Sequence, residues 1–266
     1  MDYLEQLENK SIYIIREAYA RFKKIALLWS IGKDSTTLLW IARKAFFGNI
    51  PFPIVHIDTG FKFKEIYDFR NKYSKDWGLN LLISKNKLAL DDKCCTQQGK
   101  FECCNKLKTE ALKLTLNEFN FKALFLAIRR DEHGIRAKER CFSLRDTDFK
   151  WDYKNQLAEL WDLYKSEALL GQHLRIHPML HWTELDIWKY IHKEKIPIVS
   201  LYLAKNNSRY RSIGCYPCCS PVNSKANNIK KIIKELENTN IAERSGRAQD
   251  KENTYTMQKL RSLGYM

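Results

Sequence analysis

Short apolar runs alternate with longer segments of helical period along the first half of the chain. The runs span residues 25–29, 54–57, 81–86 and 123–128. Apolar residues recur at helical spacing in the segments between and before them, at residues 1–22, 35–45, 64–77 and 105–119. Buried strands that alternate with helices of about 10–15 residues are typical of a parallel sheet covered on both faces. The pattern therefore predicts an α/β fold, a parallel twisted sheet with helices on both faces.

The pattern weakens after residue 140. Residues 145–153 are polar and aromatic, which predicts a loop over the site, and residues 174–178 predict another strand. Thr183 is expected to cap a helix that runs to His192. Residues 204–223 are irregular, and helices are expected at about 224–237 and 254–263. We expect a main domain over residues 1–200 and a small irregular and helical segment, residues 201–266, that packs on it.

Polar motifs follow three of the predicted strands, at residues 30–35, 58–60 and 129–136. The carboxyl ends of parallel strands meet at one edge of a sheet, and ligands bind there, near a switch in strand order. The three motifs are therefore expected to converge on one ligand site.

The first of these motifs, Ser30-Ile31-Gly32-Lys33-Asp34-Ser35, connects a strand to a helix. A helix start offers free N–H groups and a positive dipole end to an anion, and a glycine lets the backbone approach it. The lysine adds a positive charge and the two serines add hydroxyl donors. A Walker A loop is excluded, because Leu27 and Asp34 stand where that motif needs glycine and Ser or Thr. The loop predicts a phosphate site, with an ordinary strand-to-helix turn as the alternative.

Composition and charge narrow the class of partner. Apolar residues make up 44% of the chain and the formal net charge is +15. The charge favours anionic partners such as nucleotides or nucleic acid, although a generic lysine-rich surface would give the same value. No apolar run approaches the roughly 18–20 residues that span a bilayer, and the N-terminus lacks the regions of a secretory signal. We expect a cytoplasmic protein with no membrane contact.

The phosphate loop and four further stretches resemble the N-type ATP pyrophosphatases. The chain from residue 25 onward is similar to the branch that holds 3′-phosphoadenylylsulfate reductases and the small subunit of bacterial sulfate adenylyltransferase. The stretches that carry this resemblance are residues 30–35, 56–63, 129–132 with 136–140, 182–184 with 186–188, and 245–247. The resemblance implies an adenine nucleotide alpha hydrolase-like, Rossmann-like fold, and an enzyme that splits ATP into AMP and pyrophosphate.

The resemblance also implies roles for individual residues. The loop residues Ser30, Ile31, Gly32, Lys33, Asp34 and Ser35 would hold pyrophosphate, and Asp58, Thr59 and Gly60 would lie beside the adenosine. Arg129, Arg130 and Arg136 would face the phosphates or the incoming anion, as Lys33 does, and arginines after a strand end suit that task. The alternatives are surface ion pairs of the arginines with Glu132 or Glu139, and Asp58 as a mere helix cap. Mg²⁺ is expected, because ATP chemistry needs its charge neutralised.

Eight cysteines in a cytosolic chain indicate a metal site or catalysis more than structural disulfides. Cys103 and Cys104 with the distant Cys215 and Cys218 resemble the [4Fe-4S] ligand pattern of the adenylylsulfate reductase branch. Zinc, or buried and free thiols, are the alternatives. Other cysteines have open roles: Cys219 as a substitute for Cys218, Cys94 and Cys95 as sulfur carriers or redox thiols, and Cys141 as core. No cysteine follows residue 219, which disfavours a thiol-dependent sulfonucleotide reductase.

Three functions remain open from the sequence. The leading hypothesis is an ATP pyrophosphatase that adenylates an oxyanion for sulfur incorporation into DNA (phosphorothioation) or RNA. It would work with a [4Fe-4S] cluster and a cysteine desulfurase or another sulfur-transfer protein, and the positive charge fits a nucleic-acid substrate. The second is the small subunit of sulfate adenylyltransferase, with a GTPase large subunit as partner. The third is a non-catalytic nucleotide-binding subunit.

Overall fold

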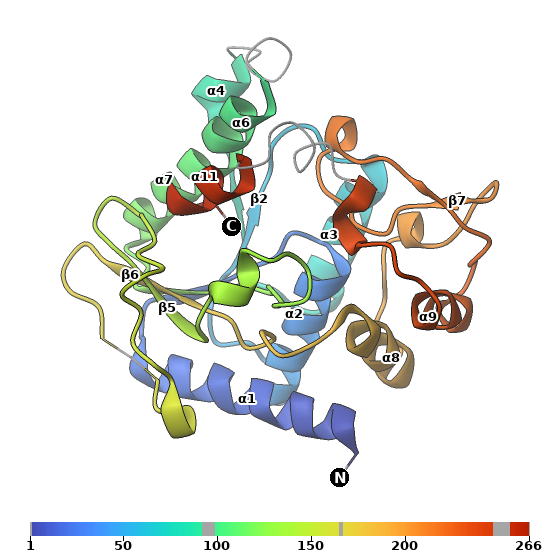
Figure 1. Ribbon diagram of the computed structural model, residues 1–266. Helices are drawn as coiled ribbons and strands as arrows, with labels where there is room; N and C mark the ends of the chain where they lie inside the picture. The colour runs from blue at the N-terminus through green and yellow to red at the C-terminus, as the bar shows by residue number, and fades with distance from the viewer. Residues whose placement is uncertain (1, 92–98, 165–166, 247–255, 266) are drawn as a thin grey trace.

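The computed structural model describes residues 2–91, 99–164, 167–246 and 256–265. A six-stranded sheet in the order β3-β2-β1-β4-β6-β5 forms its centre (Figure 1). All neighbouring strands pair in parallel except β5, which runs antiparallel to β6 at the edge. The strands of this sheet are β1 Ile25–Leu28, β2 Ile54–Ile57, β3 Leu81–Ser84, β4 Ala123–Phe125, β5 Phe142–Arg145 and β6 His173–Ile176. The parallel α/β sheet expected from the apolar runs is confirmed.

Helices connect the strands. In the described residues they are α1 Tyr3–Arg21, α2 Lys33–Ala45, α3 Lys64–Asp76, α4 Lys87–Asp91, α6 Gly99–Cys104, the π-helix η1 Asn105–Glu110, α7 Ala111–Phe119, α8 Glu184–Glu194, α9 Ile229–Glu237 and α11 Thr256–Ser262. Short 3₁₀ turns are η2 Arg136–Lys138, η3 Leu160–Asp162, η4 Ser200–Tyr202, η5 Tyr216–Cys218 and η6 Glu243–Gly246, and a two-stranded ribbon is formed by β7 Ser208–Arg209 and β8 Val222–Asn223. None of the helices described is long and apolar enough to cross a bilayer.

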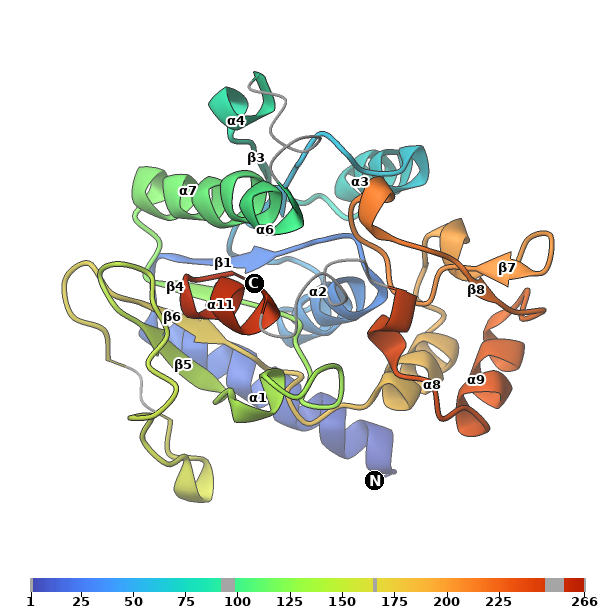
Figure 2. The same ribbon diagram turned by 45° about the horizontal axis from the view of Figure 1, so that its top comes forward.

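Alternate residues of the strands pack into two separate cores. Ile25 and Leu27 of β1 face one core together with α1, α2 and α8, and Ala26 and Leu28 face a second core with α7. Figure 2 shows α1 and α2 on one side of the strands and α7 on the other. Helices on both faces explain why these strands read as continuous apolar runs, with no polar alternation.

The order of the strands places a switch point beside β1. The chain passes from β1 to β2 and β3 on one side, and β4 then returns to pair with β1 on its other side, Ile25 opposite Ala123. Loops that leave neighbouring strands in opposite directions open a crevice at the carboxyl ends of the strands. The loop after β1 begins at this point, as the sequence predicts.

The structure differs from the expected elements in three places. Strand β4 ends at Phe125, so residues 126–128 form part of a pocket wall. The segment expected as one helix over 105–119 begins as the π-helix η1. The expected loop over 145–153 follows an unforeseen strand, β5, which carries the buried polar residues Ser143 and Arg145. The cap of α8 is as expected, because the Thr183 side chain accepts a hydrogen bond from the backbone N–H of Asp186.

The C-terminal segment returns to the sheet edge at which the loop after β1 lies. Leu260 of α11 and Tyr265 pack against Cys104 at the end of α6, and Figure 1 shows α11 beside α6 and α7. Arg175 of β6 donates from Nη1 to the backbone oxygen of Tyr265 at 2.8 Å, which anchors the end of the segment. The division at residue 200 stays a prediction, but residues beyond it contribute to the pocket.

Candidate functional site

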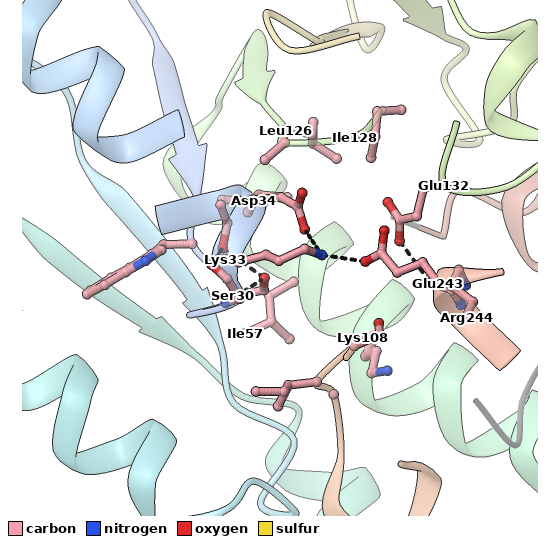
Figure 3. Close-up of a pocket in the computed structure, with 18 of the residues that line it drawn as sticks. Ser30, Lys33, Asp34, Ile57, Lys108, Leu126, Ile128, Glu132, Glu243 and Arg244 are labelled. Carbon is pink, nitrogen blue, oxygen red and sulfur yellow. Dashed lines mark hydrogen bonds and ion pairs between the residues drawn. The ribbon is translucent and has the colours of Figure 1, made fainter. Parts of the chain in front are cut away.

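A pocket lies at the carboxyl ends of β1, β2 and β4, at the switch point (Figure 3). Apolar residues that follow or end these strands form its walls: Leu28, Val55, Ile57, Leu126 and Ile128. Polar and charged residues come from the loop after β1 and from segments beyond residue 100: Ser30, Lys33, Asp34, Ser35, Lys108, Glu132, Arg136, Tyr202, Glu243, Arg244 and Tyr265. An apolar slot with a strongly charged end suits a nucleoside and its phosphates.

The loop after β1 takes its sharp turn at Ile31. Ile31 has a φ of 67° in the left-handed region, which is strained for a β-branched residue. Gly32, to which the sequence analysis assigned the close backbone approach, is the N-cap of α2 with an extended φ of −74°. A Cβ on Gly32 would meet Ser30 Oγ at 3.4 Å and Tyr202 Oη at 3.5 Å, which are ordinary contacts. The strained turn at Ile31 therefore sets the direction in which the loop leaves β1.

The residues at the start of α2 line the pocket. No side chain caps the helix. The backbone N–H of Lys33 donates to the Tyr202 hydroxyl at 2.9 Å, and the hydroxyls of Ser30 and Ser35 lie 3.0 Å apart. An uncapped helix start with adjacent hydroxyls is an anion-binding arrangement.

The ammonium group of Lys33 is buried between two carboxylates. Its Nζ contacts Asp34 Oδ2 at 3.0 Å and also forms an ion pair with Glu243 of η6. Figure 3 shows Lys33 reaching from the loop toward Glu243. Burial opposes the charged form of Glu243, but Lys33 and Arg129 outweigh it and hold its pKa well below the usual range. Glu243 is therefore an anion held in the pocket by the loop lysine.

Arg129 joins the same network after β4. Its fully buried guanidinium forms ion pairs with Asp34 and Glu243, and its Nε donates to Asp131 Oδ1 at 2.9 Å. Burial disfavours its charge, yet the carboxylates of Glu243 and Asp131 raise its pKa. Arg129 and Lys33 thus converge on the carboxylate of Glu243, and their predicted role toward a phosphate stays a prediction.

The other two arginines predicted at the site, Arg130 and Arg136, lie in different surroundings. Arg130 is not among the described residues that line the pocket, and its Nη1 lies 2.8 Å from Nδ1 of His181. Its role toward a phosphate stays a prediction without support from this geometry. Arg136, in contrast, lines the pocket and forms an ion pair with Glu132. Arg136 thus pairs with a nearby glutamate, but in a buried position and not at the surface, and its role toward a phosphate stays a prediction.

The turn after β2 serves the architecture around the pocket. Asp58 Oδ1 accepts hydrogen bonds from the Gly60 N–H and the Tyr67 hydroxyl, both at 2.9 Å, and Asp58 Oδ2 contacts Lys85. Burial opposes its charge, but these hydrogen bonds lower the pKa of Asp58. Thr59 Oγ1 lies 3.2 Å from the sulfur of Cys215. None of residues 58–60 is among the described lining residues, and their place beside an adenosine stays a prediction.

The predicted ligand cysteines are only partly brought together. Cys104, Cys215 and Cys218 are buried and interact electrostatically with one another and with Lys108. Cys103, however, is disulfide-bonded. Within the described ranges no group of three or more His, Cys, Asp or Glu side chains has an arrangement that holds a metal ion. The disulfide removes Cys103 from the predicted four-thiolate [4Fe-4S] or zinc site, so the described residues do not fit that site. Cys94 and Cys95 lie outside the described residues.

Several lining residues escaped the sequence analysis. Glu132 was expected only as a possible ion-pair partner of an arginine, although it belongs to the stretch 129–132 that carries the family resemblance. Glu243 lies beside the stretch 245–247, so its neighbourhood was a usable signal. Lys108 stands among other lysines, at residues 106 and 113, and nothing in its local sequence singles it out. Tyr202 and Tyr265 gave no signal, because only the tertiary fold brings them to the pocket.

Comparisons with known proteins agree with this architecture. A solved phosphoadenylyl-sulfate (PAPS) reductase from Candida auris, in a phosphate complex, superposes with a TM-score of 0.55 at 16% identity, over 84% of this chain and 98% of that one. A Candida glabrata FMN adenylyltransferase in complex with ATP gives a TM-score of 0.57 at 20% identity, over 82% of this chain and 63% of that one. At such identities these likenesses show the fold alone.

The sequence comparisons go further. The sulfate adenylyltransferase subunit 2 of Aliivibrio fischeri (strain MJ11) is 40% identical over 296 residues, covering 100% of this chain and 98% of the relative. The subunit 2 of Stutzerimonas stutzeri (strain A1501) is 40% identical over 301 residues, with the same coverage. A family model for the phosphoadenosine phosphosulfate reductase domain matches residues 24–221. The chain therefore belongs to the phosphoadenosine phosphosulfate reductase domain family, and within it to the group of sulfate adenylyltransferase subunit 2 proteins.

Proposed function

We propose that the chain is the small, adenylylating subunit of a sulfate adenylyltransferase, which joins ATP and sulfate into adenylylsulfate and releases pyrophosphate. The observation that carries the proposal is the 40% identity to sulfate adenylyltransferase subunit 2 proteins over the whole chain. The pocket adds chemical support, since Lys33 and Arg129 converge on an anion position at a helix start. This is the alternative function of the sequence analysis, and the relatives favour it over sulfur incorporation into nucleic acid.

The lining residues suggest where each part of ATP binds. The apolar wall of Leu28, Ile57 and Leu126 suits the adenine ring. The start of α2, with Lys33 and Arg129, would hold the β- and γ-phosphates that leave as pyrophosphate. The Asp34 and Glu243 carboxylates beside them are the hard oxygen ligands that Mg²⁺ prefers, and together with the phosphates they would hold it. Bound there, Mg²⁺ would neutralise charge on the leaving group.

The proposed reaction is one displacement at the α-phosphorus. An oxygen of sulfate attacks that phosphorus, the bond from it to the oxygen that bridges the β-phosphorus breaks, and pyrophosphate leaves with that oxygen and its electron pair. Attacking and leaving oxygens lie roughly in line in such a transfer. The protein's part is therefore positioning and charge stabilisation, and Lys33 and Arg129 would act on the leaving-group side.

ATP must compete with Glu243 for its place. Lys33 and Arg129 both contact the Glu243 carboxylate, and the side chain of Glu243 is only 5% exposed. A triphosphate that binds these two cations would displace this carboxylate or bridge to it through Mg²⁺. Binding of ATP would therefore be coupled to the position of η6 in the C-terminal segment.

The remaining predictions on partners are not equally supported. The name subunit 2 of the relatives implies a second subunit there, and we propose a large-subunit partner for this chain as well, a GTPase as the resemblance implies. A nucleic-acid substrate, a desulfurase partner and a [4Fe-4S] cluster have no supporting observation in the described residues beyond the net charge of +15. They stay predictions, as does the cytoplasmic location.

The test is the exchange of labelled pyrophosphate into ATP, with and without sulfate, by the chain alone and together with a sulfate adenylyltransferase large subunit. We expect exchange that requires sulfate and is lost in Lys33→Met, while Lys64→Met, an exposed lysine at the start of α3, exchanges normally. Exchange that proceeds without sulfate, or only on addition of DNA or RNA, would reject the proposal in favour of the other functions. So would a complete lack of exchange in both preparations.

A further inference from the structure

Three cysteines lie within five residues in the turn η5 and at its two ends, beside the pocket. They are Cys215, Cys218 and Cys219, and Gly214, the residue before them, lines the pocket. Cys215 and Cys218 are each 7% exposed and are present as thiols, whereas Tyr216 between them is 63% exposed. The turn therefore directs Tyr216 outward and the thiols of Cys215 and Cys218 inward.

The backbone of this turn brings the two buried thiols within disulfide range. The N–H of Cys218 donates to the backbone oxygen of Cys215 at 3.0 Å, which closes a turn between these residues. The Cα atoms at the ends of such a turn lie within about 7 Å of each other, and a disulfide joins Cα atoms that are about 4.4–6.8 Å apart. Pro217 stiffens the turn, because its ring fixes φ. Cys215 and Cys218 can therefore be joined with little movement of the backbone.

Other described cysteines are placed less well for such a reaction. Cys103 already belongs to a disulfide. Cys141 lies in the core, where burial raises its pKa to about 12 and leaves it inert. The sulfur of Cys219 accepts a hydrogen bond from the N–H of Gly214 at 3.0 Å, which holds it on the other side of the turn's backbone contacts. The pair of Cys215 and Cys218 is thus the best candidate for a reversible disulfide.

Contacts of the same turn reach the wall of the pocket. The sulfur of Cys215 lies 3.2 Å from Thr59 Oγ1, and the N–H of Tyr216 donates to the backbone oxygen of Phe61 at 2.8 Å, so the turn is attached to the loop after β2. Residues 212–214, directly before the turn, line the pocket. A disulfide would redirect the side chain of Cys215 away from Thr59, and would change the backbone of residues 212–214 with it.

We propose that Cys215 and Cys218 form a redox-active dithiol, a modification site that hydrogen peroxide converts to a disulfide. The Cys215 sulfur attacks one peroxide oxygen, the O–O bond breaks, and water leaves while Cys215 becomes a sulfenic acid. The Cys218 sulfur then attacks the Cys215 sulfur, the S–O bond breaks, and a second water leaves. In all, the two thiols lose two electrons and two protons, and the peroxide is reduced to two waters.

The disulfide form should bind ATP more weakly, because residues 212–214 form part of the pocket wall. Coupling between two sites is typically about 5–150-fold, and we expect about tenfold here. The coupling is reciprocal, so saturating ATP should raise the reduction potential of the pair by about 30 mV, the equivalent of tenfold for a two-electron couple. This coupling rests on the proposed function, since it takes ATP as the ligand of the pocket, whereas formation of the disulfide does not.

The test exposes the reduced protein to hydrogen peroxide, blocks the remaining thiols by alkylation and locates the disulfide by mass spectrometry. Trypsin releases residues 212–225 as one peptide, which contains all three cysteines. We expect this peptide to carry one alkyl group, at Cys219, and to be restored to three by dithiothreitol. Cys141→Ser should form the disulfide as the parent does, whereas Cys218→Ser should not. Isothermal titration before and after oxidation should show about a tenfold weaker affinity for ATP in the parent and a change within about twofold in Cys218→Ser.

Each outcome decides one of the two proposals. A peptide 212–225 that still carries three alkyl groups after oxidation overturns the redox site, and so does a disulfide that joins it to peptide 101–106, which contains Cys104. A disulfide that forms within the peptide without a change in ATP affinity overturns the coupling. If Cys218→Ser does not fold, the oxidised and reduced forms of the parent still decide these outcomes. If the disulfide forms but neither form binds ATP, the proposed function fails and the redox site stands.

Discussion

Lys33 and Glu243 form a buried ion pair although 210 positions separate them in the chain. Their side chains are 1% and 5% exposed, and Glu243 also contacts Arg129. A carboxylate of the C-terminal segment thus occupies the position where the cations of Lys33 and Arg129 converge. This contact ties the segment to the occupancy of the pocket.

Replacement of Glu243 by glutamine should strengthen the binding of ATP and lower the free energy of unfolding of the ATP-free protein. The variant lacks the internal anion that competes with the phosphates, so we expect the Kd for ATP measured without Mg²⁺ to fall roughly tenfold, equivalent to about 1.4 kcal/mol. Loss of one partner from a buried ion pair should lower the free energy of unfolding by about 3 kcal/mol. Isothermal titration and urea unfolding measure the two quantities. Glu237→Gln, at an exposed pair with Lys189, is the control, and a weaker affinity for ATP in Glu243→Gln would contradict the competition.

Arg129 and Arg130 are neighbours in sequence with opposite expected effects. Arg129→Gln removes a fully buried partner of Asp34, Asp131 and Glu243, so exchange should be lost and stability should fall by about 3 kcal/mol or more. Arg130 contacts His181 outside the pocket, so Arg130→Gln should keep exchange within about twofold. The rate of pyrophosphate exchange and the thermal unfolding of the two variants measure these effects. An equal loss of exchange in both variants would indicate that Arg130 also acts in the pocket, and would contradict its position outside the pocket.

Stability should fall with acidification below about pH 6.5. Burial lowers the pKa of His56 to about 4, that of His177 to about 3 and that of His173 to about 2. Between those values and 6.5 the unfolded chain binds protons that the folded protein does not, so the free energy of unfolding decreases as pH falls through this window. The slope is at most about 1.4 kcal/mol per pH unit for each histidine. Above pH 6.5 these groups are neutral in both states and add no slope.

Urea unfolding at pH 8, 7, 6 and 5 measures this dependence. His177→Gln should reduce the dependence of the free energy of unfolding on pH below 6.5 by the contribution of one histidine. His192→Gln, at an exposed position in α8, should leave this dependence unchanged. Stability that is constant between pH 7 and 5 in the parent protein would mean that these histidines are accessible and protonated in the folded state.

The position of Gly264 should control how Tyr265 packs. Gly264 has a φ of 95°, and a Cβ there would lie 2.7 Å from the backbone oxygen of Phe149. Gly78 also has a positive φ, 59°, but no atom lies within 4 Å of an added Cβ. Gly78→Ala should therefore cost only the strain of the left-handed conformation, about 1 kcal/mol, while Gly264→Ala should lower the free energy of unfolding by more than that, because its Cβ also clashes with the backbone of Phe149. Equal stabilities of the two variants would show that the chain end shifts freely.

Local patterns were sufficient for the centre of the fold and for the loop after β1. Strands β1, β2 and β4 are buried on both faces, so each appears as an apolar run that sequence alone reveals. Strand β5 was missed because Ser143 and Arg145 are buried polar residues, which a hydropathy pattern scores as exposed. The buried arginine is compensated by Glu139, a partner that only the tertiary structure supplies.

The same limit applies to the site. Lys33 and Arg129 were predicted because each sits at the end of a strand, where parallel sheets bind ligands. Glu243 and Lys108 act through contacts with residues far away in the chain, Lys33 in one case and Tyr265 in the other. No local spacing encodes such pairs, so they became visible only in the folded protein.

The central claim is that the pocket joins the AMP part of ATP to sulfate. The most direct measurement is incubation of the protein with ATP, Mg²⁺, ³⁵S-sulfate and a pyrophosphatase that removes the product, together with a large subunit, followed by chromatography of the nucleotides. The account predicts that the label appears in adenylylsulfate, and that Lys33→Met abolishes it. If all of the ³⁵S remained in free sulfate while the protein still bound and split ATP, the result would contradict this claim.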